Sequence, residues 1–363
     1  MSSSSVVSSE TLLLLGGIIL LLLTTVATLT VSRSILSQRT DRRDAEALPR
    51  VRQTLLERME ATDPEWEEWV EGLSASERRV ATDLLEDYLQ RIRGGDRTSL
   101  QRLGYALGID QQARRKLHDG DHIERRWALH WIARLDVDVT TATLEATCGD
   151  HPETRAAAAR VLYEQERPDA AQAGTALLLR GSSPMSVLGI DTLYHLNKLS
   201  PGPLVTSARG SYDEWSESRL IQVLRVIGKA GPVKPQTDLG WIGFLFLSNS
   251  PTVRAAAAES LFGYGWHNDV RSVVEVDQVR TDGSPQVRRA VYRMLGSWGD
   301  EVSTNALCDA IRTESNPRAA IDAISALGER STRLPESELS TASSAARDWV
   351  LASTDLRHRE TVR

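Results

Sequence analysis

Residues 251–265 read PTVRAAAAESLFGYG: a proline, then an arginine and four alanines, ahead of two large apolar residues, Leu261 and Phe262. Nearly the same phrase occurs at two other places, as PETRAAAARVLYEQE at 152–166 and as PQVRRAVYRMLGSWG at 285–299. The phrase holds no group well suited to nucleophilic or metal chemistry. Because self-similarity of this kind is the signature of a repeat architecture, we interpret the phrase as structural.

The proline sets the phase of the repeat. In the first turn of a helix its missing N–H leaves no hydrogen bond unmade, and its fixed φ is already helical. With the proline as position zero, repeats begin at Pro152, Pro184, Pro251, Pro285 and Pro317, and Glu217 fills the one gap of double length. The starts are 32 to 34 residues apart, and a weaker copy, IERRWALHWIARL, begins near His122.

Positions six and ten of each repeat are mainly apolar, and a spacing of four keeps them on one helix face. The pairs are Ala158 and Leu162, Ile190 and Tyr194, Val223 and Ile227, Ala257 and Leu261, Val291 and Leu295, and Ala323 and Leu327. Shorter apolar segments, starting at Ala170, Leu239 and Ser303, lie between these helices. Helix pairs with this period predict an all-α fold, a right-handed α-solenoid of about seven pairs at residues 98–334.

The segments SPTVRAAAAESL, SPQVRRAVYRML, NPRAAIDAISALG and HPETRAAAARVL resemble the second helix of HEAT repeats, particularly of the short HEAT-like kind. The resemblance covers residues 98–330 and is strong in the four repeats quoted. Tetratricopeptide repeats have a similar period, but they place a proline near the end of the second helix, whereas here the proline opens it. The resemblance implies an extended concave surface that binds another protein.

An arginine follows the proline by three residues in three repeats, as Arg155, Arg254 and Arg288. HEAT-like repeats tend to place an arginine there that pairs across successive turns, so the resemblance implies a structural ladder. A row of arginines that binds an anionic protein is the alternative. The last repeat has Ala320 at this position, so either row ends before it.

Residues 11–31, TLLLLGGIILLLLTTVATLTV, form an uncharged run that follows a polar N-terminus at 1–10. As a helix the run would span about 30 Å, the thickness of the hydrocarbon core of a bilayer, so it predicts a transmembrane helix. Basic residues follow it, beginning with Arg33, Arg39, Arg42 and Arg43, which places the carboxyl side in the cytoplasm. The alternative is a cleaved signal peptide and an exported solenoid, although signal peptides favour a basic start and a shorter apolar core.

Two further segments flank the repeats. Residues 32–97 predict a basic juxtamembrane segment and a helical connector, in which Asp63 and Pro64 start one helix and a capping box of Ser74 and Glu77 starts the next. Residues 335–363 predict a capping helix, with Trp349 and Val350 covering the end of the core, and a polar tail.

Composition argues against several functions. The formal net charge of -6 does not favour a nucleic-acid partner, because phosphate binding needs a basic excess. The two cysteines, Cys148 and Cys308, fit neither a zinc site nor a disulfide framework. Deoxyhypusine hydroxylases resemble this scaffold and use His-Glu dipeptides for a di-iron site, but none of the seven histidines precedes a glutamate. No cofactor or metal site is expected, and an enzyme of the lyase or hydroxylase kind remains the alternative.

These features predict a non-enzymatic scaffold that a single span holds at the inner face of the cell membrane. The sequence does not identify the protein that the solenoid binds. The layout resembles that of anchored prokaryotic HEAT proteins thought to accompany membrane enzymes, including glycosyltransferases that make polysaccharides.

Overall fold

The computed structural model describes residues 22–25, 42–229 and 238–361. Within these ranges the regular elements are all helices and no strand occurs, which confirms the predicted all-α fold. The chain forms two compact units: the first extends to Arg114 and includes Arg134–Val137, and the second comprises Arg115–Ala133 and continues from Asp138. Each unit is described separately below.

The first unit begins with a helix at residues 42–60, which is followed by α2 (Trp66–Glu71), α3 (Ala75–Arg91) and α4 (Gly95–Ala106). The predicted capping box is confirmed at the start of α3. The amide of Glu77 donates to Ser74 Oγ at 3.3 Å, and the amide of Ser74 donates to the Glu77 carboxylate at 3.0 Å.

The predicted start of α2 is wrong. Pro64 is buried outside the helix, and Glu65, with a φ of 47°, precedes the first helical residue, Trp66. The Arg58 guanidinium donates to the carbonyls of Pro64 and Glu65. These hydrogen bonds hold the two residues in a turn, so the helix begins only after them.

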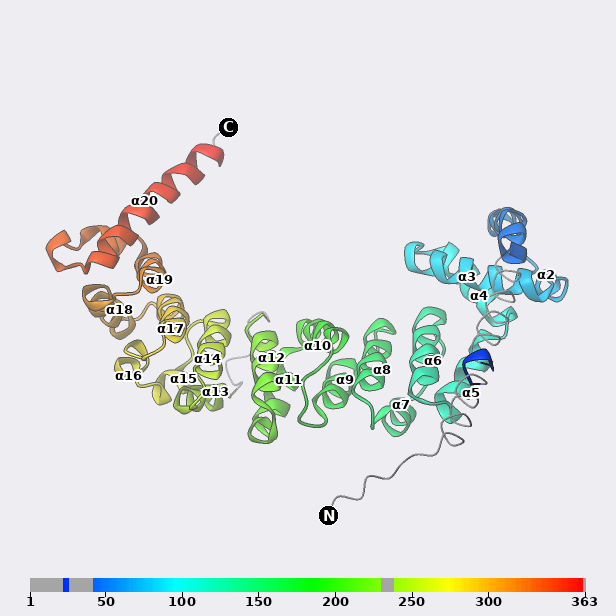
Figure 1. Cartoon of the computed structure of the whole chain (residues 1–363), viewed down its shortest axis with the longest axis horizontal. Coiled ribbons are helices and arrows are strands. Elements are labelled where there is room, and N and C mark those ends of the chain that lie inside the picture. The colour runs from blue at the N-terminus through cyan, green and yellow to red at the C-terminus, as the bar shows by residue number, and fades with distance from the viewer. Residues whose placement is uncertain (1–21, 26–41, 230–237, 362–363) are drawn as a thin grey trace, which may run out of the picture. The chain divides into compact units, whose positions relative to one another are not determined.

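The second unit is a series of helix pairs (Figure 1). The first helices of the pairs are α7 (Thr141–Cys148), α9 (Ala170–Leu179), α11 (Pro201–Arg209), α13 (Gly240–Phe244) and α18 (Glu301–Thr313). In the pair that ends with α17, the first helix is divided into two short helices, α15 (Asn268–Val273) and α16 (Val276–Arg280). The second helices are α8 (Pro152–Glu164), α10 (Val187–Leu199), α12 (Glu217–Gly228), α14 (Pro251–Tyr264), α17 (Pro285–Trp298) and α19 (Pro317–Leu327). Two more helices, α5 (Ile109–Asp119) and α6 (His122–Leu135), lie where the two units divide.

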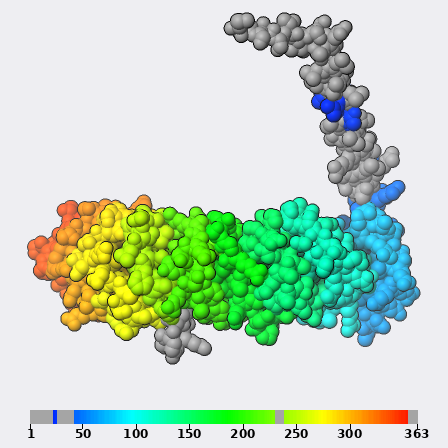
Figure 2. All heavy atoms as spheres, turned by 90° about the horizontal axis from the view of Figure 1, so that it is seen from below, coloured from blue at the N-terminus to red at the C-terminus, as the bar shows by residue number. Residues whose placement is uncertain are grey.

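Each second helix packs against the next one, from α8 through α10, α12, α14 and α17 to α19. Figure 2 shows the same succession at the surface, where the helices of the second unit follow one another in chain order. Neighbour-only packing is what makes a helical repeat array stable. The predicted solenoid-like stacking is therefore confirmed in the second unit.

The proline rule correctly gives the start of α8, α14, α17 and α19, and Glu217 is the first residue of α12. It is wrong at Pro184, because Ser186 caps the helix by accepting from the amide of Gly189 and α10 begins at Val187. The register shifts by three, so Ile190 and Tyr194 are only half-buried. Leu193 lies in the core at 0% exposure instead.

After the last repeat comes α20 (Thr341–Thr361), which packs against α19. The prediction that Trp349 covers the core is wrong, because its side chain is 57% exposed. Among the α20 residues whose side chains the structure describes, the buried ones are small, Ser343 and Ala346. Small side chains allow the backbone of α20 to approach the last repeat closely.

The predicted membrane span at residues 11–31 lies outside the described residues except at 22–25, where the chain is helical and Leu22 and Leu23 are exposed. Among the helices that the structure describes, none combines the length and the apolar character needed to cross a bilayer.

Candidate functional site

The three predicted arginines lie near the start of the second helices α8, α14 and α17, next to the turn that connects the two helices of a pair. Arg254 Nη1 donates to the carbonyl of Ser248 at 2.8 Å, three residues before the proline of its own repeat. Its Nε and Nη2 donate to the carboxylate of Asp282, in the turn that opens the next repeat, at 2.7 and 3.0 Å. The side chains of Arg254 and Asp282 are 18% and 12% exposed. This pair therefore joins two successive repeats in a partly desolvated turn.

Asp282 also caps its own turn, because its carboxylate accepts from the amide of Ser284 at 2.8 Å. Burial alone would raise the pKa of Asp282, but the hydrogen bonds from Arg254 and Ser284 outweigh it and lower the pKa. The hydrogen bond to Asp282 raises the pKa of Arg254. Both groups consequently stay charged at neutral pH.

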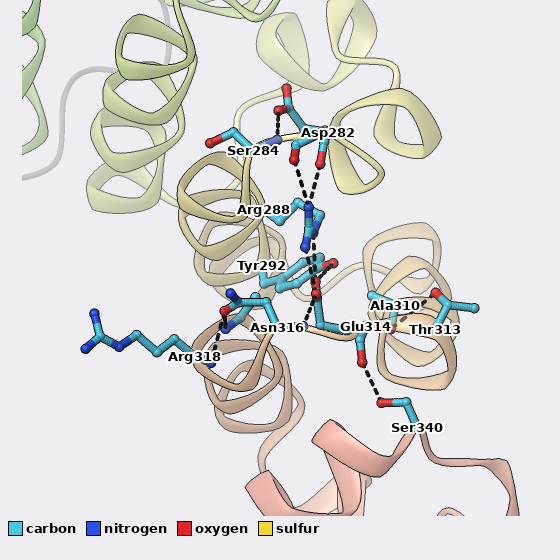
Figure 3. Close-up of polar contacts among 12 residues, drawn as sticks. Asp282, Ser284, Arg288, Tyr292, Ala310, Thr313, Glu314, Asn316, Arg318 and Ser340 are labelled. Carbon is cyan, nitrogen blue, oxygen red and sulfur yellow. Dashed lines mark hydrogen bonds and ion pairs between the residues drawn. The ribbon is translucent and has the colours of Figure 1, made fainter.

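Arg288 makes the same arrangement in the next repeat (Figure 3). Its Nη1 donates to the carbonyl of Asp282 at 2.8 Å, and its Nε and Nη2 donate to the Glu314 carboxylate at 2.8 and 2.7 Å. Glu314 also accepts from the Tyr292 hydroxyl and from the amide of Asn316, both at 2.8 Å. Its side chain is only 1% exposed, so hydrogen bonds from protein groups replace those that water would make to this carboxylate.

Arg155, the third predicted residue, is 9% exposed, and its Nη1 donates to the carbonyl of Gly149 at 2.9 Å. The structure thus does not bring the three arginines together on one open surface. Of the arginines expected to set membrane topology, Arg42 and Arg43 are exposed at the start of the helix at 42–60, and Arg33 and Arg39 lie outside the described residues.

A more accessible site is a groove of about 350 Å³ across α12, α14 and α17, which we call the α14 groove. Residues at position eight of three successive repeats line it: Arg225, Glu259 and Arg293. The rest of the lining consists of Gly228, Lys229, Phe262 and Ala290. The second helices stack in register, so a position that recurs in each repeat forms a row of side chains.

The α14 groove carries three cations and one carboxylate. Arg293 is engaged, since its Nη2 lies 3.5 Å from Glu259 Oε1 and its Nε lies 4.0 Å from Asp322 Oδ1. Arg225 and Lys229 are exposed and have no ion-pair partner among the residues that the structure describes. Phe262 is 48% exposed. The groove therefore combines positive charge at the C-terminal end of α12 with an apolar surface on α14.

Sequence reasoning missed the α14 groove because each of its residues is unremarkable within its own helix. The available signal was the shared repeat position of Arg225, Glu259 and Arg293, each eight residues after the start of its repeat. Sequence reasoning also missed Asp282 and Glu314, the carboxylates that pair with Arg254 and Arg288. The available signal was that each of them lies three residues before a proline.

The described residues offer little for catalysis. No three histidine, cysteine or acidic side chains among them are grouped so as to hold a metal ion. Burial raises the pKa of both thiols, Cys148 and Cys308, and a protonated thiol is a weak nucleophile. His122, the first residue of α6, and His151, the N-cap of α8, stack with ring centroids 4.6 Å apart.

In comparison with known protein families, residues 240–328 match the family model for HEAT repeats. This range runs from α13 to the end of α19. It includes the α14 and α17 side of the α14 groove, with Glu259, Phe262 and Arg293, and the turns of Arg254 and Arg288, but not Arg225 and Lys229. No curated protein and no solved structure matches the chain significantly. The family match and the stacked helix pairs together support a HEAT-repeat protein, a class of helical scaffold for protein interactions.

Proposed function

We propose that the protein is a non-enzymatic scaffold whose α14 groove binds an acidic segment of a partner protein. The observation that carries the proposal is the presence of two cations without a described ion-pair partner, Arg225 and Lys229, beside the half-exposed ring of Phe262. An acidic residue that enters the groove would meet two cations that no described carboxylate neutralises. An apolar neighbour in the same segment would cover Phe262, and buried aromatic contacts dominate many interfaces.

A second exposed aromatic, Trp266, follows Phe262 by four residues in the sequence. Trp266, which follows α14, is 46% exposed, and its ring meets the ring of Trp298 edge-on with centroids 6.2 Å apart. Exposed aromatic surface beside unpaired charge is typical of interaction sites. The partner segment is therefore expected to carry acidic and apolar residues together.

Site-specific photocrosslinking tests this proposal. With p-benzoylphenylalanine in place of Phe262, irradiation of intact cells is expected to produce a covalent adduct with a partner protein. The same probe in place of Val302 on α18 is a matched control, because the two side chains are 48% and 50% exposed. The double substitution Arg225→Glu and Lys229→Glu, added to the Phe262 probe, is expected to reduce the adduct at least tenfold.

The charge reversal is not expected to disturb folding, since Arg225 and Lys229 are exposed, and circular dichroism checks this. Equal adducts from the Phe262 and Val302 probes would contradict the proposal, as would an adduct that survives the charge reversal.

We also propose that residues 11–31 hold the scaffold at the cytoplasmic face of the cell membrane. Support comes from the length of this uncharged run and from the basic residues that follow it. A membrane position would bring the α14 groove close to integral membrane enzymes, such as glycosyltransferases, and we expect the partner among them.

Fractionation tests the anchor. The full chain is expected in carbonate-washed membranes and protected from protease added outside intact cells, whereas a chain that lacks residues 11–31 is expected in the supernatant. A mature chain that begins near residue 32 and appears outside the cell would show export instead. The photocrosslinking result does not depend on this outcome.

A further inference from the structure

The arginine ladder, formed by the pairs Arg254–Asp282 and Arg288–Glu314, follows one hydrogen-bonding pattern with two parts. In the repeats that begin at Pro251 and Pro285, Nη1 of the arginine three residues after the proline binds a carbonyl of its own turn. The Nε and Nη2 edge then binds a carboxylate three residues before the proline of the next repeat, Asp282 for Arg254 and Glu314 for Arg288. Bidentate pairing of this kind matches the planar guanidinium to the planar carboxylate.

Arg155 makes the hydrogen bond to a carbonyl, the first part of the pattern, but has no described carboxylate partner for the second part. Its Nη1 binds the carbonyl of Gly149, as the pattern requires. Because α10 begins three residues after Pro184, a count from this proline does not locate the counterpart of Asp282 and Glu314, but the distances to Arg155 identify Gly181 as the residue beside it. A Cβ added to Gly181 would lie 3.7 Å from Arg155 Nη2, so the open edge of the guanidinium faces this glycine. No carboxylate among the described residues lies within ion-pair distance of Arg155.

More positive charge surrounds this turn. Arg219 is 1% exposed and donates to the carbonyls of Leu178, Arg180 and Ser183, while its Nε has no acceptor in the part of the chain that the structure describes. Arg180 belongs to the same turn, and its one described ion pair, with Glu145 at 3.8 Å, is solvent-exposed. Three guanidinium groups therefore lie around this turn, and no buried carboxylate among the described residues pairs with them.

The protonation equilibria agree with this geometry. Burial, and then the neighbouring Arg180, lower the pKa of Arg155, and Asp150 offsets this only in part. Burial and the charge of Arg155 lower the pKa of Arg219 to about 10. A lowered arginine pKa means that the charged form is held at unfavourable free energy, which an incoming anion would relieve.

We propose that Arg155 and Arg180 bind a carboxylate beside Gly181, where it pairs with Arg155 as Asp282 pairs with Arg254 and Glu314 with Arg288. The site is accessible from solvent, because Arg180, Gly181 and Ser182 are all exposed. Arg155 Nε and Nη2 hold the carboxylate bidentately, and Arg180 approaches it from the solvent side. The ligand is either a free organic acid or an aspartate or glutamate side chain of a docking protein. This site is separate from the α14 groove.

The site is tested by thermal unfolding in acetate, with the Tm in chloride at equal ionic strength as the reference. For the wild-type chain, acetate at ten times its dissociation constant is expected to raise Tm by about 3 °C. In Gly181→Asp the chain supplies its own carboxylate, so the acetate effect is expected to vanish. Gly181→Asn is the matched control, because it bears the same strain at a φ of +79° without the charge, and it is expected to keep the acetate effect.

Arg155→Met removes the guanidinium edge and is expected to lose the acetate effect even if Gly181→Asp fails to fold. The peptide acetyl-Gly-Glu-Gly-amide, with its glutamine analogue as control, distinguishes the two sources of the ligand. Stabilisation by the glutamate peptide indicates a protein side chain, and stabilisation by acetate alone indicates a small acid. An absent acetate effect in the wild-type chain, or an equal effect in Gly181→Asp or Arg155→Met, would overturn the proposal.

Discussion

Replacing Glu314 with glutamine is expected to lower the free energy of unfolding by about 3 kcal/mol, because it leaves Arg288 charged and partly buried without its counter-ion. The carboxylate is 1% exposed, and besides both donors of Arg288 it holds Tyr292 and the amide of Asn316. Glutamine keeps the size of the side chain and one acceptor oxygen, so the loss reports the charge. Urea unfolding at pH 7 measures it.

Glu338→Gln is the matched control for Glu314→Gln. Glu338 also pairs with an arginine, Arg312, at 2.7 Å, but these side chains are 43% and 42% exposed. Solvent-exposed pairs contribute about 0.2 to 1 kcal/mol, so this variant is expected to lose less than a third as much. Equal losses in the two variants would show that burial of Glu314 does not govern its contribution.

The same carboxylate makes stability depend on pH. Burial would raise the pKa of Glu314, but the hydrogen bonds from Arg288, Asn316 and Tyr292 lower it from 4.5 to about 2. Its contribution is therefore fully present above the unfolded pKa and disappears as pH falls from about 4.5 through the folded value. The stability difference between wild type and Glu314→Gln is expected to shrink between pH 5 and pH 2, and a constant difference would contradict this assignment.

The sequence predicted the helix starts well wherever the proline occupies the first turn, as at Pro251, Pro285 and Pro317. It failed at Pro184 because a serine two residues later caps the helix. A proline is compatible with a first turn but does not require one. A side chain that accepts from a backbone amide competes with it, and spacing alone does not show which of the two starts the helix.

The candidate sites could be predicted only in part. Arg254 and Arg288 were visible from their constant distance to the proline, but their partners, Asp282 and Glu314, belong to the following repeat. The α14 groove depends on side chains about 34 residues apart in sequence, which only stacking brings side by side. Repeat position indicates which residues share a row, whereas exposure and pairing, as for Arg225 and Phe262, depend on the packed array.

Replacing Gly263 with alanine is expected to destabilise the array although alanine is the better helix former. Helix propensity alone would stabilise α14 by about 1 kcal/mol. A Cβ at Gly263, however, would lie 2.2 Å from the carbonyl oxygen of Gly228, and backbone cannot move aside as a side chain can. The contact is reciprocal, because a Cβ at Gly228 would lie 2.7 Å from the Cα of Ser260. Forced separation of α12 from α14 is expected to outweigh propensity and to cost about 3 kcal/mol.

Gly283→Ala is the control for Gly263→Ala, because its added Cβ meets nothing within 4 Å and its φ is not positive; it is expected to change stability by less than about 0.5 kcal/mol. Urea unfolding measures both variants. Because repeats are stabilised by their neighbours, a weakened contact between α12 and α14 is also expected to broaden the unfolding transition or divide it in two. A gain of about 1 kcal/mol in Gly263→Ala, the value for helix propensity alone, would mean that α12 and α14 do not meet through the carbonyl of Gly228.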